Sequence, residues 1–205
     1  MTGGDAFEAI LLAAGAGSRF GGGKLLAPWR GGVLLDGALA ATFAAPVRRV
    51  VVVTGADGVA VGQAVRAFAG RTGQADRLHL VHAPDHAEGM GASLRTAAAA
   101  LSKGAAGVFV FLGDMPRIPA GIADDLAQAV RSGALAAAPV FQGERGHPAL
   151  IGRALIPQLL ILKGDAGARA VLKDLGDRLV RVEAPDDGVL FDVDERGDLD
   201  ASAKK

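Results

Sequence analysis

Short runs of branched apolar residues alternate along this chain with longer stretches in which apolar residues recur every three or four positions. The short runs are typical of buried strands in a parallel sheet, and the longer stretches are typical of helices packed on its faces. The sequence predicts four such strands in its first half: Phe7 to Ala13, Val50 to Thr54, Leu78 to His82 and Val108 to Leu112. The helices predicted from the longer stretches are Leu34 to Phe43, Gly58 to Ala69, Ser93 to Leu101 and Ile122 to Arg131.

The regular alternation of strands and helices ends after residue 131. Further strands are predicted at Leu135 to Val140, Pro148 to Ile151, Leu179 to Glu183 and Val189 to Val193. Further helices are predicted at Arg153 to Ile161 and Ala166 to Leu175, with a short helix at the C-terminus. No fixed repeat or linker divides the chain, so we expect one α/β domain over residues 1–205. Ligands of such sheets lie beyond the carboxyl ends of the strands, which is where we look for chemistry.

Composition narrows the chemistry. The chain has no cysteine, which excludes disulfides, thiolate zinc sites and a cysteine nucleophile. Its 22 basic and 22 acidic residues cancel, and one tryptophan without any tyrosine offers no stacking ladder, so we expect no nucleic acid and no membrane partner. The first ten residues lack a signal-peptide pattern and no apolar run approaches about 20 residues, so we expect a cytoplasmic protein.

A glycine-rich string, "LLAAGAGSRFGGGK", follows the first predicted strand. Gly15 and Gly17 fit the start of a dinucleotide fingerprint, but Phe20 stands where its third glycine belongs. A Walker loop fails as well, because Ser18 replaces a glycine and Leu25 replaces the final serine or threonine. Neither of these two nucleotide-binding motifs is present.

Two cations remain in that string, Arg19 and Lys24, close to backbone amides that few side chains shield. Such a loop can hold a triphosphate, because amides and cations share its negative charge. The alternative is an ordinary glycine-rich turn with two solvated cations.

Carboxylates occur at two further places. Asp114 follows an apolar strand in "VFVFLGDMP", where it can enter a cleft or take part in a turn. Asp192 and Asp194 alternate in "LFDVDERGDL", so on the predicted strand they would share one face. Phosphoryl transfer needs a hard divalent cation, and carboxylate oxygens suit magnesium.

These strings occur in the order found in the molybdopterin nucleotidyltransferase superfamily, the MobA-like NTP transferases, which the chain resembles from Leu12 to Leu199. The resemblance implies a Rossmann-like three-layer α/β/α fold with a mostly parallel mixed sheet. It also implies a nucleotide-binding half, about residues 7–120, and an acceptor-binding half, about residues 121–200. The "LAAG" string and the glycine before Lys24 look more like the cytidylyltransferase branch than the guanylyltransferase branch.

The resemblance also assigns roles to residues. It makes Arg19, Lys24 and Asp114 catalytic, with Asp114 and Asp192 as ligands of Mg²⁺ or Mn²⁺. Asp194 is left as either a helix cap or a weaker neighbour of the metal. The nucleotide CTP is expected to contact the loop and the turn in "EGMGASLRTA", through Leu12, Ala13, Ala14, Gly15, Gly17, Arg19, Lys24, Gly89, Met90, Gly91 and Ser93.

Three residues are expected on the acceptor side. His147, in a "GHP" turn, either donates a hydrogen bond to an acceptor phosphate or fixes the turn. Asp165 and Arg169, in "LKGDAGARAVL", either form a helix cap with an intrahelical ion pair or bind the terminal phosphate of the acceptor. Ser93 is likewise a helix cap on its sequence alone.

The resemblance implies CMP transfer from CTP to the molybdopterin (molybdenum) cofactor, with release of pyrophosphate and delivery to a recipient molybdoenzyme or its chaperone. Three alternatives stay open. One changes the substrates to GTP or to a sugar or alditol phosphate. Another is an NAD(P)H-dependent oxidoreductase of the nicotine blue oxidoreductase type. The last is a nucleotide-binding carrier without turnover. Paired carboxylates favour the transferase, since neither hydride transfer nor carriage requires a metal site.

Overall fold

The computed structural model describes residues 6–202 of the 205-residue chain. Its strands are β1 Phe7–Ala13, β2 Pro28–Trp29, β3 Gly32–Val33, β4 Val47–Thr54, β5 Leu78–His82, β6 Gly107–Leu112, β7 Ala136–Phe141, β8 Glu144–Arg145, β9 Ala149–Gly152 and β10 Val180–Glu183. Its α-helices are α1 Leu34–Ala44, α2 Gly58–Arg71, α3 Met90–Ala99, α4 Ile122–Arg131, α5 Ile156–Leu159, α6 Ala168–Lys173 and α7 Arg196–Ser202. Short 3-10 helices at Lys24–Leu26, Ala75–Arg77, His86–Glu88, Arg153–Leu155, Gly176–Arg178 and Asp187–Val189 complete the elements.

One sheet runs through the molecule in the order β10-β7-β9-β6-β1-β4-β5, and β8 pairs with β7. Strands β5, β4, β1 and β6 are parallel to one another, and β7 is parallel to β10. Strand β9 is antiparallel to both of its neighbours. The carboxyl ends of the parallel strands therefore lie at one edge of the sheet.

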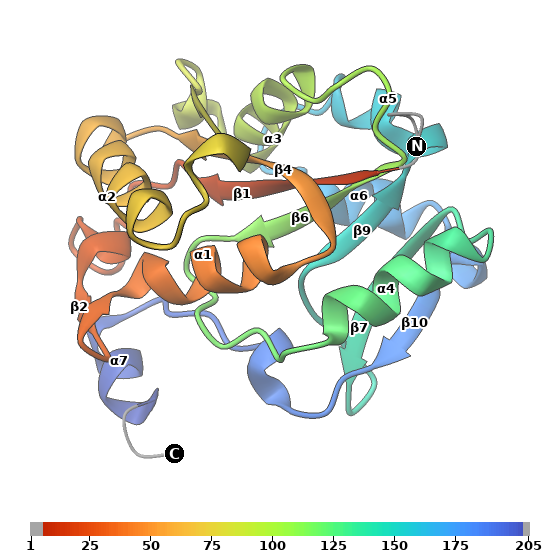
Figure 1. The fold of residues 1–205 in the computed structure, drawn as a ribbon. Coiled ribbons are helices and arrows are strands. Elements are labelled where there is room, and N and C mark those ends of the chain that lie inside the picture. Colours follow the sequence, from red (N-terminus) through yellow and green to blue (C-terminus); the bar gives the residue numbers. More distant parts are fainter. Residues whose placement is uncertain (1–5, 203–205) are drawn as a thin grey trace.

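Helices cover both faces of this sheet (Figure 1). Side chains of α1, α2 and α4 form one buried cluster with the strands. Side chains of α3, α5 and α6 form another cluster on the opposite face. The three-layer α/β/α arrangement with a mostly parallel mixed sheet, which the family resemblance implies, is confirmed. Among residues 6–202, no helix is both long and apolar enough to cross a membrane.

The sequence-based elements of the first half match the structure closely, but several later ones are wrong. Residues 189–193 form no strand; Val189 ends a 3-10 helix and the chain continues without regular pairing. The helix expected from Arg153 to Ile161 is a 3-10 turn followed by the short helix α5, and α6 is shorter than expected. Pattern reasoning also misses the hairpin β2–β3 and strand β8.

Candidate active site

The glycine-rich loop and Asp114 leave the sheet from neighbouring strands. Leu12 of β1 pairs with Leu112 of β6, and the amide of Gly113 donates to the Leu12 carbonyl oxygen at 2.9 Å. Both segments consequently start from the same point at the carboxyl edge of the sheet. The loop therefore lies beside Asp114, although about 90 residues separate Lys24 from Asp114 in the sequence.

The glycines give the loop its shape. Gly17 has a φ of +58°, and a Cβ added there would lie 2.9 Å from the Cβ of Lys24. Its carbonyl oxygen accepts from the amides of Phe20 and Gly22, which folds the loop back on itself. Because position 17 needs both a left-handed backbone and a close approach, only glycine fits there without strain. The loop then presents Lys24 at the start of a 3-10 helix.

Lys24 and Asp114 form a close ion pair. The Nζ atom of Lys24 donates to Oδ2 of Asp114 at 2.6 Å, and the lysine side chain is only 12% exposed. A charge-assisted bond in so little water is stronger than one at the surface. It joins the glycine loop to the turn that follows β6.

A second carboxylate approaches the same lysine from the C-terminal segment. Oδ1 of Asp194 lies 3.7 Å from Lys24 Nζ, and Oδ2 of Asp194 accepts from Arg19 Nη1 at 2.5 Å. The hypothesis that Asp194 caps the last helix is wrong. That capping comes from Asp198, whose Oδ2 accepts from the amides of Asp194 and Glu195. Asp194 thus belongs to the ion-pair network of the site.

Arg117 holds the C-terminal segment against the sheet. Its Nη2 donates to Oδ1 of Asp187 at 2.7 Å, and its guanidinium lies 4.6 Å from the ring centroid of Phe191. Farther along, the amide of Val193 donates to the Asp114 carbonyl oxygen at 3.1 Å. These contacts bring Asp192 and Asp194 to the edge where Asp114 lies, without the strand that the sequence predicts there.

Together these segments enclose a pocket of about 310 Å³. It is lined by Gly17, Ser18, Arg19, Lys24, Met90, Leu112, Asp114, Asp192 and Asp194. Six of these residues are among the sequence-predicted site residues. Sequence reasoning misses Ser18 and Leu112 and undervalues Asp194, although the second aspartate of "LFDVDERGDL" was visible.

The pocket carries a local excess of negative charge. Partial burial raises the pKa of Asp192, and the nearby carboxylates of Asp194 and Asp114 raise it further, while a backbone hydrogen bond and Lys24 oppose the shift. In the described part of the chain, Asp192 has no ion-pair partner. No group of three acidic or histidine side chains within residues 6–202 is already arranged as a metal cluster. Oxygen donors with unbalanced negative charge nevertheless fit a hard divalent cation, so the donor set suits magnesium or manganese.

The predicted nucleotide turn borders this pocket through Met90. Gly89 has a φ of +119° and precedes α3, so the helix starts at Met90 and Ser93 lies inside it. The expectation that Ser93 caps this helix is therefore wrong; its side chain is buried in the first turn. The amide of Gly91 donates to the carbonyl oxygen of Gly164 at 2.7 Å, so this turn packs directly on the loop before α6.

Two acceptor-side expectations change at that loop. Gly167, not Asp165, occupies the cap position of α6. Asp165 and Arg169 form no ion pair with each other in the described chain, so the purely structural explanation for that sequence fails. Arg169 is an exposed cation on α6.

His147 lies at the same edge of the sheet but outside the pocket. Its amide donates to the carbonyl oxygen of Val189 at 2.8 Å, and its Nδ1 atom is buried with no hydrogen-bond partner in residues 6–202. Burial lowers the pKa of His147 and neighbouring Arg145 lowers it further, while a hydrogen bond with the Val110 backbone and the carboxylate of Asp114 oppose the shift. The imidazole is therefore neutral at pH 7 and can donate only one ring hydrogen.

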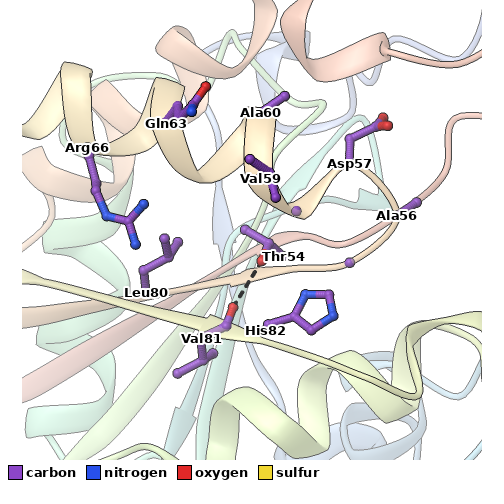
Figure 2. Close-up of a pocket in the computed structure, with 12 residues that line it drawn as sticks. Thr54, Ala56, Asp57, Val59, Ala60, Gln63, Arg66, Leu80, Val81 and His82 are labelled. Carbon is purple, nitrogen blue, oxygen red and sulfur yellow. Dashed lines mark hydrogen bonds between the residues drawn. The ribbon is translucent and has the colours of Figure 1, made fainter.

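A larger cavity of about 750 Å³ lies between α2 and the edge strand β5 (Figure 2). Arg66 extends from α2 toward Leu80 of β5, and Gln63 and His82 also line the cavity. The hydroxyl of Thr54 donates to the Val81 carbonyl oxygen. The cavity contains none of the sequence-predicted site residues. With one arginine and one carboxylate, Asp57, its lining lacks the charges that a triphosphate and a metal ion require. The smaller pocket is the better candidate by chemistry.

Comparison with known proteins shows the family of the chain. The family model of the MobA-like NTP transferase domain matches residues 9–181. The chain is 28% identical to molybdenum cofactor cytidylyltransferase of Escherichia coli K12 over 197 residues, covering 95% of this chain and 94% of that protein. It is 33% identical to nicotine blue oxidoreductase of Paenarthrobacter nicotinovorans over 194 residues, covering 90% of each.

A solved structure extends the likeness to three dimensions. It is a homologue of the Mycobacterium tuberculosis protein Rv0371c from Mycobacterium sp. strain JC1. It superposes with a TM-score of 0.79 at 26% identity, covering 96% of this chain and 94% of that one. Taken with the family match, this places the chain in the MobA-like NTP transferase family, as an enzyme of the nucleotidyltransferase class.

Proposed function

We propose that this enzyme transfers CMP from CTP to the terminal phosphate of the molybdopterin cofactor and releases pyrophosphate. One observation carries the proposal: Lys24 and the carboxylates of Asp114, Asp192 and Asp194 converge at the carboxyl edge of the sheet. The cytidine base is suggested by the full-length similarity to the E. coli cytidylyltransferase. The glycine before Lys24 also favours the cytidylyltransferase branch.

The reaction we infer is a direct displacement. A phosphate oxygen of the acceptor attacks the α-phosphorus of CTP, a new P–O bond forms, and the bond to the β-phosphate oxygen breaks as pyrophosphate leaves. No covalent intermediate with the enzyme is required. Positioning of the two phosphates supplies most of the rate in reactions of this class.

The chain's own residues have distinct parts in this proposal. Amides of the glycine loop, Arg19 and Lys24 bind the triphosphate. The phosphates then compete with Asp114 and Asp194 for these two cations. Asp114 and Asp192 would hold the divalent cation, which when bound neutralises charge on the α-phosphate. The turn from Gly89 would border the base and sugar.

The proposal is tested by mixing the protein with magnesium, molybdopterin cofactor and one nucleoside triphosphate at a time, and measuring pyrophosphate. We expect release with CTP and at most trace release with GTP. Asp114→Asn should abolish release. Asp57→Asn, which changes the exposed aspartate just before α2, serves as the matched control. If no nucleoside triphosphate gives pyrophosphate, the proposal is contradicted. If only GTP gives pyrophosphate, GTP replaces CTP as the substrate.

A second candidate follows from the 33% identity to nicotine blue oxidoreductase. In that case the pocket would bind a reduced nicotinamide cofactor, and NADH or NADPH absorbance would decay in the presence of a quinoid pigment. That reaction needs neither magnesium nor the carboxylates. Oxidation that survives chelation and the Asp114→Asn substitution would support it against the transferase.

A further inference from the structure

Three arginines on three separate elements lie near enough to interact electrostatically: Arg145 on β8, Arg169 on α6 and Arg181 on β10. We call them the arginine cluster. Only Arg169 is a sequence-predicted site residue; the sequence alone does not indicate that Arg145 and Arg181 lie near it.

Strand register places Arg145 and Arg181 on one face of the sheet. Arg181 pairs with Ala138 of β7, and Arg145 pairs with Val140, two residues farther along the same strand. Alternate residues of a strand point to the same face, and paired residues follow their partners. Ala138 belongs to the buried cluster that contains Val171 and Leu172 of α6. Both arginines therefore share the α6 face, and α6 carries Arg169.

The cluster holds positive charge that the protein does not balance. No carboxylate in the described chain forms an ion pair with any of the three, although Glu183 follows Arg181 on the same face of β10. Burial lowers the pKa of Arg145, and the neighbouring Arg169 and Arg181 lower it further. A half-buried cation beside two others is costly, and a bound anion would offset that cost.

The position of the cluster relates it to the transfer reaction. Strand β7 is two strands from β6, at whose end Asp114 lies. Val140 of β7 pairs with β10 on one side and with Arg145 of β8 on the other, so Arg145 lies on the side of β7 that faces β6 and Arg181 lies on the far side. Two strand spacings are about 10 Å. Arg145 is also close enough to His147 to lower its pKa, and the buried Nδ1 of His147 has no partner in residues 6–202. The cluster thus continues the active-site edge on its acceptor side.

We propose that Arg145, Arg169 and Arg181 form a subsite for a second anionic group of the acceptor, about two strand spacings from its attacking phosphate. The ligand class is an oxyanion, which guanidinium groups bind with paired hydrogen bonds. The inference rests on the proposed function for the identity of the acceptor, but the anion site itself is independent of turnover. It predicts that acceptors lacking a distal anion are poor substrates.

Two measurements test the subsite on the full-length protein. Inorganic phosphate is titrated calorimetrically into wild type, Arg145→Gln and Arg181→Gln, with Lys103→Gln as a control that removes one exposed charge before β6. Acceptor KM and CTP KM are then measured by pyrophosphate release. We expect each cluster substitution to weaken phosphate binding and raise acceptor KM about tenfold, while CTP KM stays within about twofold, since one charge-assisted bond is lost. Glu183→Gln should lower acceptor KM, because it removes a negative charge next to the cluster.

The outcomes separate the subsite from the proposed function. Phosphate binding that weakens in both cluster variants supports the subsite even if wild type releases no pyrophosphate, a result that would overturn only the proposed function. Unchanged phosphate affinity in the exposed variant Arg181→Gln, or an equal loss in Lys103→Gln, overturns the subsite. Arg181→Gln keeps the test decisive if Arg145→Gln does not fold. Rising CTP KM with constant acceptor KM also overturns it.

Discussion

Asp114→Asn removes the negative charge at the centre of the pocket while preserving the shape of the side chain. In the structure, Asp114 Oδ2 accepts from Lys24 Nζ at 2.6 Å, and the aspartate side chain is 27% exposed. A hydrogen bond between charged groups contributes about 1.5–3 kcal/mol to stability. Asn retains a neutral acceptor, and Asp194 stays 3.7 Å from the same ammonium, so much of that contribution survives.

Charge repulsion in the pocket reduces the loss further. Asp114 is one of the carboxylates that raise the pKa of Asp192, so its removal relieves repulsion in the folded state. We therefore expect a net loss of about 1 kcal/mol, which for a chain of this length lowers Tm by about 2–4 °C. The pKa of Asp192 should fall in the variant, which carbon-detected NMR of the carboxyl group can follow.

The effect on turnover should be much larger than the effect on stability. Removing one group that stabilises developing charge typically costs about 10²–10³ in kcat. We expect kcat/KM for CTP to fall at least about 100-fold, measured by coupled pyrophosphate release, with Asp57→Asn close to wild type. A folded Asp114→Asn enzyme within about fivefold of wild type would refute the assignment of Asp114 to the reaction.

Three further predictions concern the segments that shape the pocket. Arg117→Ala should lower kcat with less effect on CTP KM, because the segment bearing Asp192 loses its anchor; an Arg117→Lys variant that recovers part of kcat would support positioning, and unchanged kinetics would refute it. Gly17→Ala should raise CTP KM about tenfold, because a Cβ in a left-handed conformation costs about 1–2 kcal/mol, and an unchanged KM would remove the loop from the site. Asp198→Ala should lower unfolding free energy by about 1 kcal/mol near pH 7. Since backbone amides lower the pKa of Asp198, that difference should persist above pH 3.8 and vanish as pH falls through the lowered pKa, as urea titrations would measure.

Buried parallel strands are the part of this fold that the sequence predicts best. Strand β1 begins and ends where its apolar run does, and β6 differs from its predicted run by one residue, because a strand covered on both faces needs continuous apolar residues. Residues 189–193 show why the same reasoning fails elsewhere. Val189 packs with Ile122, whereas Val193 packs with Phe20 and Leu34. Their alternating pattern reflects two separate apolar clusters, and no neighbouring strand pairs with them.

The site divides in a similar way. The motif order in the sequence predicts that Lys24, Asp114 and Asp192 act together, and the structure places all three around one pocket. The role of Asp194 could not be predicted from the sequence, because its partner Arg19 lies 175 residues away. Its position before the last helix suggests a cap, but Asp198 accepts the backbone hydrogen bonds there. The start of α3 was also hidden, because it depends on the positive φ of Gly89. The arginine cluster required strand register, which no spacing along the chain reveals.

The central claim is that carboxylates from two distant segments hold a divalent cation beside the glycine loop. Crystals grown with Mn²⁺ and a non-hydrolysable CTP analogue test it through the anomalous scattering of manganese. The account predicts a manganese peak bonded to Asp114 and Asp192, with the triphosphate against Arg19 and Lys24. A peak away from these carboxylates, or a nucleotide seated in the cavity between α2 and β5, would contradict it.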